Sequence, residues 1–157
     1  MDTEVLQLMK EKGTYYVPTI YVGEFVNKEF AKKGYPEKIL NKAKMITPLL
    51  AGSLLNATKA GVKIAYGTDA GVFPHGLNAR QFVFMVKNGM TAMQAIQSAT
   101  INAADLLGKK ERIGSIEKGK FADIIAVEGD PLDNVSLLEN VYFVMKGGVV
   151  YKIKEKK

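Results

Sequence analysis

The sequence predicts an α/β fold in which parallel strands alternate with helices, followed by a small antiparallel β unit. The first observation is a short apolar run with β-branched residues at 61–66, which starts at a glycine and leads into a glycine-rich turn, as a buried strand does. The second is that helical patterns flank this run on both sides, which is the repeating unit of a parallel sheet or barrel. The third is the alternation of turn signals with β-branched runs over residues 113–151.

Composition limits the classes of function. The chain has 157 residues, 47% of them hydrophobic and 24% charged, which is enough apolar material for one globular core. It contains no cysteine, which excludes disulfides and thiolate metal sites. The net charge is +6, but Arg80 and Arg112 are the only arginines and the lysines are scattered, so we expect no nucleic-acid partner. No apolar run approaches the roughly 20 residues of a membrane span, and we expect no membrane partner and a cytoplasmic location.

The first elements are a helix and a strand. Apolar residues recur at helical spacing between a cap at Asp2 or Thr3 and a stop at Gly13, which predicts a short amphipathic helix. Residues 14–21 are rich in aromatic and β-branched side chains and predict a strand, with Pro18 near its end because proline cannot donate to a ladder.

A long helical region comes next. Residues 22–37 are polar and lysine-containing, and we expect a helical excursion that forms part of a lid or rim. The apolar residues of 37–59 keep a helical period, which predicts one long helix, kinked near Pro48, with one face packed on the sheet.

Further helices are predicted after the central strand. Asn78 is expected to cap a helix that ends at residues 88–89 and that turns Phe82, Met85 and Val86 inward. Thr91 and Gln94 match a capping box for the next helix. Residues 100–108 predict a further helical turn or short helix with a glycine stop.

Strands dominate the remainder of the chain. Residues 113–127 alternate turn signals with β-branched runs, and residues 141–151 predict a hairpin around Gly147 and Gly148. Because two or three strands bury little surface, this antiparallel unit is too short to be stable alone.

The candidate catalytic residue is Asp69, at the carboxyl end of the central strand. Ligands of α/β proteins gather on the loops that follow the strands, so a carboxylate at this place is suited to chemistry. The alternative is that Asp69 only stabilises a turn, since Asp is common before Gly in loops. The local pattern leaves both open.

Several motifs together resemble a known family. They are Gly-Thr-Asp-Ala-Gly at residues 67–71, the run from Thr100 to Gly108, the line from Ile113 to Ile125, Gly-Asp-Pro-Leu at 129–132, and an ending of the form Val-x-x-Gly-Gly. In combination they resemble the carboxyl-terminal part of the amidohydrolase superfamily, with greatest likeness to imidazolonepropionase-like and Xaa-Pro dipeptidase-like hydrolases. The resemblance covers nearly the whole chain.

The resemblance implies a fold and a role for Asp69. It places residues 1–110 in the carboxyl-terminal segment of a (β/α)₈ TIM barrel, with strands seven and eight, and residues 111–157 in part of a small β-sandwich. In the family, the carboxylate matching Asp69 binds a divalent metal and takes a proton from the metal-bound water as that water attacks an amide or ester carbonyl. The implied substrates are small amides, dipeptides or cyclic imides, and the implied metal of the full enzyme is zinc.

The chain also departs from the family pattern. The other metal ligands of the family follow earlier strands that would precede Met1, and the chain has one histidine, His75. A catalytic zinc site takes about three protein ligands, so we expect a fragment that is inactive alone and binds no metal tightly. The unpaired strand edges predict self-association or pairing with the missing amino-terminal half. The competing hypotheses are a noncatalytic interaction module and the complementing half of a split enzyme.

His75 is the candidate substrate-binding residue. It lies six residues after Asp69 in the loop at the barrel mouth, where it would contact substrate or support the site. The alternative is a loop histidine that faces water and bonds to backbone. Tyr66, Thr68 and Asn78 are weaker candidates, for which we expect roles in packing, in the turn and in capping.

Overall fold

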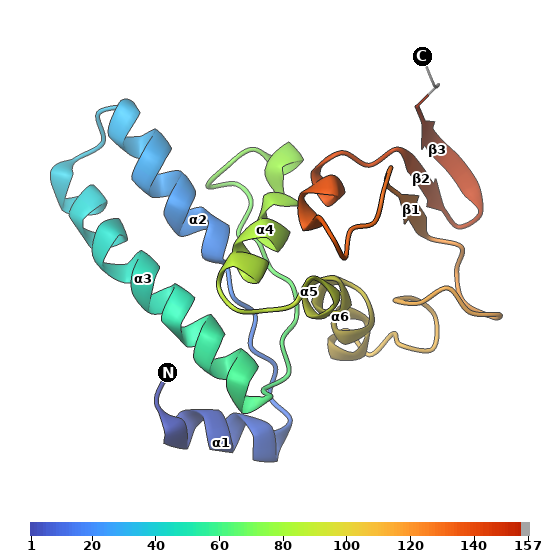
Figure 1. Cartoon of the computed structure of the whole chain (residues 1–157), viewed down its shortest axis with the longest axis horizontal. Coiled ribbons are helices and arrows are strands. Elements are labelled where there is room, and N and C mark those ends of the chain that lie inside the picture. The colour runs from blue at the N-terminus through green and yellow to red at the C-terminus, as the bar shows by residue number, and fades with distance from the viewer. Residues whose placement is uncertain (155–157) are drawn as a thin grey trace.

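The structure is a computed structural model that describes residues 1–154. Six α-helices, three short helices of other types and a three-stranded sheet follow one another in these residues (Figure 1). The α-helices are α1 (Thr3–Lys12), α2 (Ile20–Phe25), α3 (Glu37–Ala60), α4 (Arg80–Lys87), α5 (Ala92–Ala99) and α6 (Ile101–Leu106). The short helices are the π-helix η1 (Val26–Phe30) and the 3₁₀ helices η2 (His75–Leu77) and η3 (Val135–Glu139). The strands are β1 (Ile124–Ala126), β2 (Phe143–Lys146) and β3 (Val149–Ile153).

Local capping residues set both ends of α1, as predicted, and the carboxyl end of α3. The Asp2 side chain accepts a hydrogen bond from the Val5 amide at the start of α1, and Gly13 ends that helix in the left-handed conformation. Gly61 ends α3 in the same way. The predicted helical excursion is formed by α2 and η1, which lie alongside α3 (Figure 1).

Helix α3 is buried only over its last turns. Leu54 and Ala57 are inaccessible to solvent, whereas Met45 and Leu49 are each 65% exposed. The prediction of one long helix with Pro48 inside it is confirmed, but its apolar face contacts α2, η1 and α1 rather than a sheet.

The two predicted parallel strands are reduced to extended segments joined by one bridge. Tyr16 and Ile64 form an isolated parallel bridge, in which the Tyr16 amide donates to the Lys63 carbonyl at 2.8 Å and the Tyr16 carbonyl accepts from the Ala65 amide at 3.0 Å. The prediction of a strand through residue 21 is wrong because α2 begins at Ile20. Each segment has one parallel neighbour within residues 1–154, so the regular ladder of a wide sheet is not built there.

Backbone groups on the other edge of the central segment bond to helices. The Ile64 carbonyl accepts a hydrogen bond from the Asn102 side chain, and the Tyr66 amide donates to the Ser98 carbonyl. Polar groups from α5 and α6 therefore satisfy buried backbone atoms that would otherwise be costly to desolvate.

The start of α4 differs from prediction, and the start of α5 agrees. Asn78 has helical backbone angles because η2 already coils the chain before α4, so it is not the cap, and Ala79 takes that place without a side-chain bond. The capping box of Thr91 and Gln94 is confirmed, with both reciprocal bonds present.

The three strands form one antiparallel sheet in the order β1, β2, β3. The predicted hairpin around Gly147 and Gly148 joins β2 to β3, and β1 supplies the strand of the 113–127 region. Only residues 124–126 of that region are a strand, and residues 1–154 contain no second sheet to complete a sandwich.

The main core lies where α1, α3, α4 and α5 meet the central segment. Its members are Leu6, Ile20, Leu54, Ala57, Val62, Ile64, Met85, Met90 and Ala95. Met85 is fully buried as predicted, while Phe82 and Val86 are half-buried against this cluster. No helix within residues 1–154 is long and apolar enough to cross a membrane.

Candidate active site

Asp69 lies three residues beyond the buried central segment, and its side chain is exposed. Its φ angle of 55° makes it the one residue other than glycine with positive φ within residues 1–154. Aspartate tolerates this conformation better than most residues, but the backbone is still strained there. Asp69 thus presents an exposed carboxylate beyond the carboxyl end of the segment.

Phe73 anchors the loop that carries Asp69. Its ring is buried and packs edge-on against Tyr21, with the ring centroids 4.7 Å apart, and against Phe25 at 5.8 Å. Aromatic contacts of this geometry add stability beyond area burial. The loop between Asp69 and η2 is therefore fixed to α2 by one side chain.

A second set of contacts fixes the loop from the side of α4. The Thr68 hydroxyl lies 3.0 Å from the Asn78 side-chain oxygen, and the Tyr66 hydroxyl donates to the Asn78 carbonyl at 2.8 Å. Tyr66 also packs on Phe82, and burial raises its pKa well above the usual range, so its hydroxyl stays protonated. The expected packing role of Tyr66 is confirmed. Thr68 bonds to Asn78 across the loop rather than within a turn, and Asn78 braces the loop instead of capping a helix.

Gly67 brings the two extended segments close together just before Asp69. A side chain on Gly67 would place its Cβ 2.5 Å from a methyl group of Val17, closer than real contacts allow. A residue with a side chain at position 67 would therefore force the Val17 side chain to move. The spacing of the segments at their carboxyl ends, and with it the position of Asp69, depends on this contact.

His75 opens η2, and its side chain is exposed. Its carbonyl accepts hydrogen bonds from the backbone amide and the side chain of Asn78. The loop therefore holds the backbone of His75 firmly while its imidazole faces solvent, on the same loop as Asp69.

A metal centre is not complete within the described part of the chain. No group of three or more His, Asp or Glu side chains lies close enough to hold a metal ion within residues 1–154. Asp69 supplies one carboxylate, and a catalytic site requires about three protein ligands. These residues alone therefore do not fit a metal.

Two side chains that position the site, Gln81 and Phe73, were not predicted from the sequence. Gln81 is fully buried in α4, accepts from the Tyr21 amide at 2.8 Å and donates to the Pro18 carbonyl at 2.9 Å. It thereby joins α4 to the end of the first extended segment. A signal existed, because Gln81 lies four residues before the inward Met85 and so shares the buried face of the helix.

Comparison with known proteins shows which family the chain is related to. Residues 1–152 match the Amidohydrolase family, and the chain belongs to it.

Three similar proteins illustrate the range of named relatives and of sequence identity. Ochratoxinase of Aspergillus niger is 38% identical, with 96% of this chain and 32% of that protein covered. Imidazolonepropionase of Thermoanaerobacter pseudethanolicus is 30% identical over 83% of this chain and 27% of its own. A crystal structure of a Xaa-Pro dipeptidase with bound methionine in the active site is 51% identical, has a TM-score of 0.90, and is covered over 97% of this chain and 38% of its own. The chain thus spans about a third of the length of the curated relatives it matches.

Proposed function

We propose that this chain forms the carboxyl-terminal part of a metal-dependent amidohydrolase that cleaves carbon–nitrogen bonds in small amides, dipeptides or cyclic amides. In this proposal the segments bridged by Tyr16 and Ile64 are strands seven and eight of a TIM barrel. Residues 1–110 belong to the barrel and residues 111–157 to a small β domain. The relatives named above support the class of reaction.

One observation carries the proposal, namely the position of Asp69. It is an exposed carboxylate at the carboxyl end of a buried extended segment, and a parallel neighbour, Phe73 and Asn78 hold its loop in place. Active sites of TIM-barrel enzymes are built at this end of the strands. A residue that only stabilised a turn would not need a loop braced from two helices.

Asp69 would act as a base and as one metal ligand. A carboxylate beside the attacked carbonyl orients water, takes its proton as the new C–O bond forms, and passes that proton to the leaving nitrogen as the C–N bond breaks. A divalent metal, which we propose to be zinc, would lower the pKa of that water towards about 7. His75, exposed on the same loop, would contact the substrate.

Calorimetry tests the proposal on this chain. Since residues 1–154 hold no trio of ligands, we expect no hydrolysis by the isolated chain and no submicromolar binding of zinc. Submicromolar zinc affinity that disappears in Asp69→Asn would contradict the idea that the other ligands come from outside this chain.

The alternatives are a noncatalytic interaction module and the complementing half of a split hydrolase. Exposed apolar side chains at several places along the described chain, such as Leu8, Val17, Leu107 and Tyr151, favour an association of some kind. Co-expression with the preceding part of the 51%-identical Xaa-Pro dipeptidase separates them. A split hydrolase regains activity that Asp69→Asn abolishes, whereas an interaction module binds without activity.

A further inference from the structure

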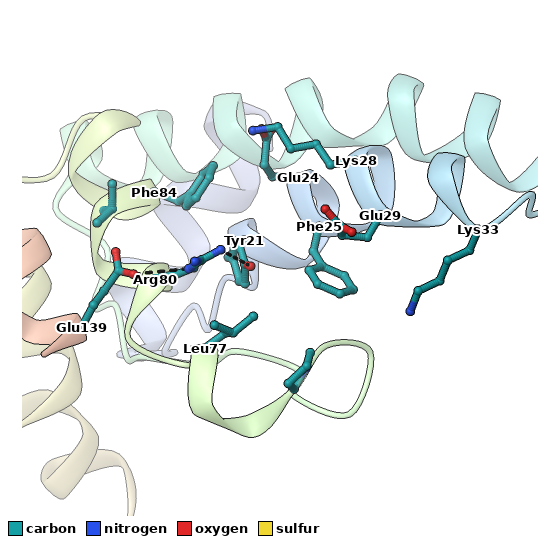
Figure 2. A pocket seen from close by; sticks show the side chains of 12 residues that line it. Tyr21, Glu24, Phe25, Lys28, Glu29, Lys33, Leu77, Arg80, Phe84 and Glu139 are labelled. Carbon is teal, nitrogen blue, oxygen red and sulfur yellow. Dashed lines mark hydrogen bonds and ion pairs between the residues drawn. The ribbon is translucent and has the colours of Figure 1, made fainter.

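A pocket of about 600 Å³ lies between α2, η1, the loop before η2, and α4 (Figure 2). This volume is within the range of small-molecule sites. Asp69 and His75 are not among its lining residues, so the pocket is separate from the catalytic carboxylate, although Pro74 of the same loop and Leu77 of η2 form part of its wall.

The body of the pocket is aromatic and apolar. Tyr21, Phe25 and Phe84 line it, and the Tyr21 ring contacts both phenylalanine rings, with centroids 6.1 Å and 5.3 Å apart. Tyr21 is itself held in place, because its amide donates to the buried Gln81 side chain. The wall is therefore preformed, which reduces the entropy that a ligand must lose on binding.

Arg80 supplies donors at one end of the pocket. Its Nε donates to Glu139 at 3.3 Å, and one Nη donates to the Tyr21 hydroxyl at 3.3 Å (Figure 2). A guanidinium has five N–H groups in a planar fork. Two hydrogen bonds fix the orientation of Arg80 and leave N–H groups available for a planar anion.

The carboxylates of the pocket are already neutralised. Glu24 pairs with Lys28 at 2.8 Å, Glu29 with Lys32 at 2.8 Å, and Glu139 with Arg80. Lys33 takes part in no ion pair with any residue of 1–154, and Figure 2 shows it at the far side of Phe25 from Arg80. Three cations and three carboxylates therefore line the pocket. Because each carboxylate already has a partner, the polar groups left free in the lining are donors, from Arg80 and Lys33.

We propose that this pocket binds an apolar monocarboxylate, whose carboxylate contacts the free side of the Arg80 fork and whose apolar body lies against Phe25 and Phe84. Carboxylates match the guanidinium fork in bidentate geometry, and the aromatic walls accept an aryl or branched alkyl group. The site requires neither a metal nor Asp69, so it stands apart from the proposed hydrolysis.

NMR titration of the 157-residue chain tests this site directly. The probe is 3-phenylpropionate, with its neutral amide as the matched ligand and inorganic phosphate as the anion without an apolar body. Because the chain has two arginines, the Nε–H signals of Arg80 and Arg112 serve as probe and internal control. We expect saturable shifts at Arg80, Phe25 and Phe84 with the acid, and at least about ten-fold weaker binding of the amide and of phosphate.

Two variants sharpen the titration. Arg80→Lys keeps the charge but loses the fork, and we expect about ten-fold weaker binding, whereas Arg112→Lys leaves affinity unchanged. Val83→Phe fills the pocket and abolishes binding, with melting temperature as the check on folding. Equal binding of acid and amide, or saturable binding whose shifts avoid Arg80, would overturn the proposal, as would the absence of saturation at 10 mM, about 10 times a millimolar Kd.

Discussion

Residues 1–108 and residues 113–154 bury their apolar side chains to very different extents. Every member of the main core cluster comes from the first region, whereas every residue of β3 is exposed. Within residues 113–154, Val135 is the one buried hydrophobic residue. The first region is therefore stabilised by a core of its own, and the second mainly by strand hydrogen bonds and turns.

This difference suggests what each region needs from outside. The first region has a packed interior but extended segments with a single parallel bridge, so its missing neighbours would be strands. The second region has paired strands, of which β2 is mostly half-buried and β3 is exposed throughout, so the neighbour that β3 would need is an apolar surface. Both needs agree with a chain that matches about a third of longer relatives.

The largest expected change in stability comes from a pair of substitutions, one in each region. Leu54→Ala leaves a cavity in the main core and should lower the free energy of unfolding by about 2–5 kcal/mol. Val149→Ala, on a β3 side chain that is 58% exposed, should change it by about 0.5 kcal/mol or less. Urea unfolding measures both. Equal losses would mean that the sheet is as well packed as the core.

Gly114 lies where the second region packs on α6 of the first, and it has a φ of 94°. We call this contact the joint between the regions. A Cβ there would lie 2.7 Å from the Ala104 Cβ and 2.9 Å from the Thr100 carbonyl, so Gly114→Ala should cost about 2–4 kcal/mol. Gly119→Ala is the matched control, since its φ of 93° gives the same strain with no atom within 4 Å. If the two variants unfold at the same urea concentration, close packing of residue 114 on α6 does not stabilise the joint.

Gln81 tests the junction beside the site. Gln81→Met keeps the shape but leaves the Tyr21 amide and the Pro18 carbonyl without their partners, at a cost of about 2–3 kcal/mol. Gln7→Met, on the exposed face of α1, should cost less than about 0.5 kcal/mol. Thermal unfolding compares the two variants. If Gln81→Met is as stable as the unsubstituted chain, Gln81 does not hold the site in position.

The smallest effect concerns Tyr15 and Asp105, which join the first segment to α6. The Tyr15 hydroxyl donates to Asp105 at 2.6 Å; this bond, with Lys63 nearby, holds the pKa of Asp105 below its usual value. Burial and Asp105 raise the pKa of Tyr15 to about 12.

Tyr15→Phe should therefore lower stability at neutral pH. Because the pKa of Asp105 is depressed in the folded state, the deficit relative to the natural chain should shrink as pH falls below about 4. Because the pKa of Tyr15 is raised, it should also shrink as pH rises from 10 to about 12. Tyr35→Phe, at an exposed stacked ring, is the control, and a deficit that does not vary with pH would contradict the linkage.

Local features were predictable from the sequence, and long-range ones were not. The caps at Asp2 and Thr91 and the hairpin turn depend on residues two to four positions apart, so their patterns predict them. The extent of the parallel strands depends on neighbours elsewhere in the chain. Of the two predicted parallel strands, the structure keeps only the one bridge that joins them.

The same reasoning applies to the site. Asp69 is recognisable because it lies shortly after a buried run, and the sequence motif around it indicates the family. The supports from Phe73 and Gln81 were missed because their partners lie about 50 to 60 residues away. Asn78 looked like a cap, and only the coiling of η2 before it shows why it is not.

A chimera tests the central claim most directly. In the 51%-identical Xaa-Pro dipeptidase, the matching carboxyl-terminal part is replaced by this chain, and dipeptide hydrolysis is measured with and without Asp69→Asn. We predict an active chimera that loses activity by about 10²–10⁴-fold in the Asp69→Asn variant, with unchanged melting temperature. A folded chimera whose activity does not depend on Asp69 would contradict the account.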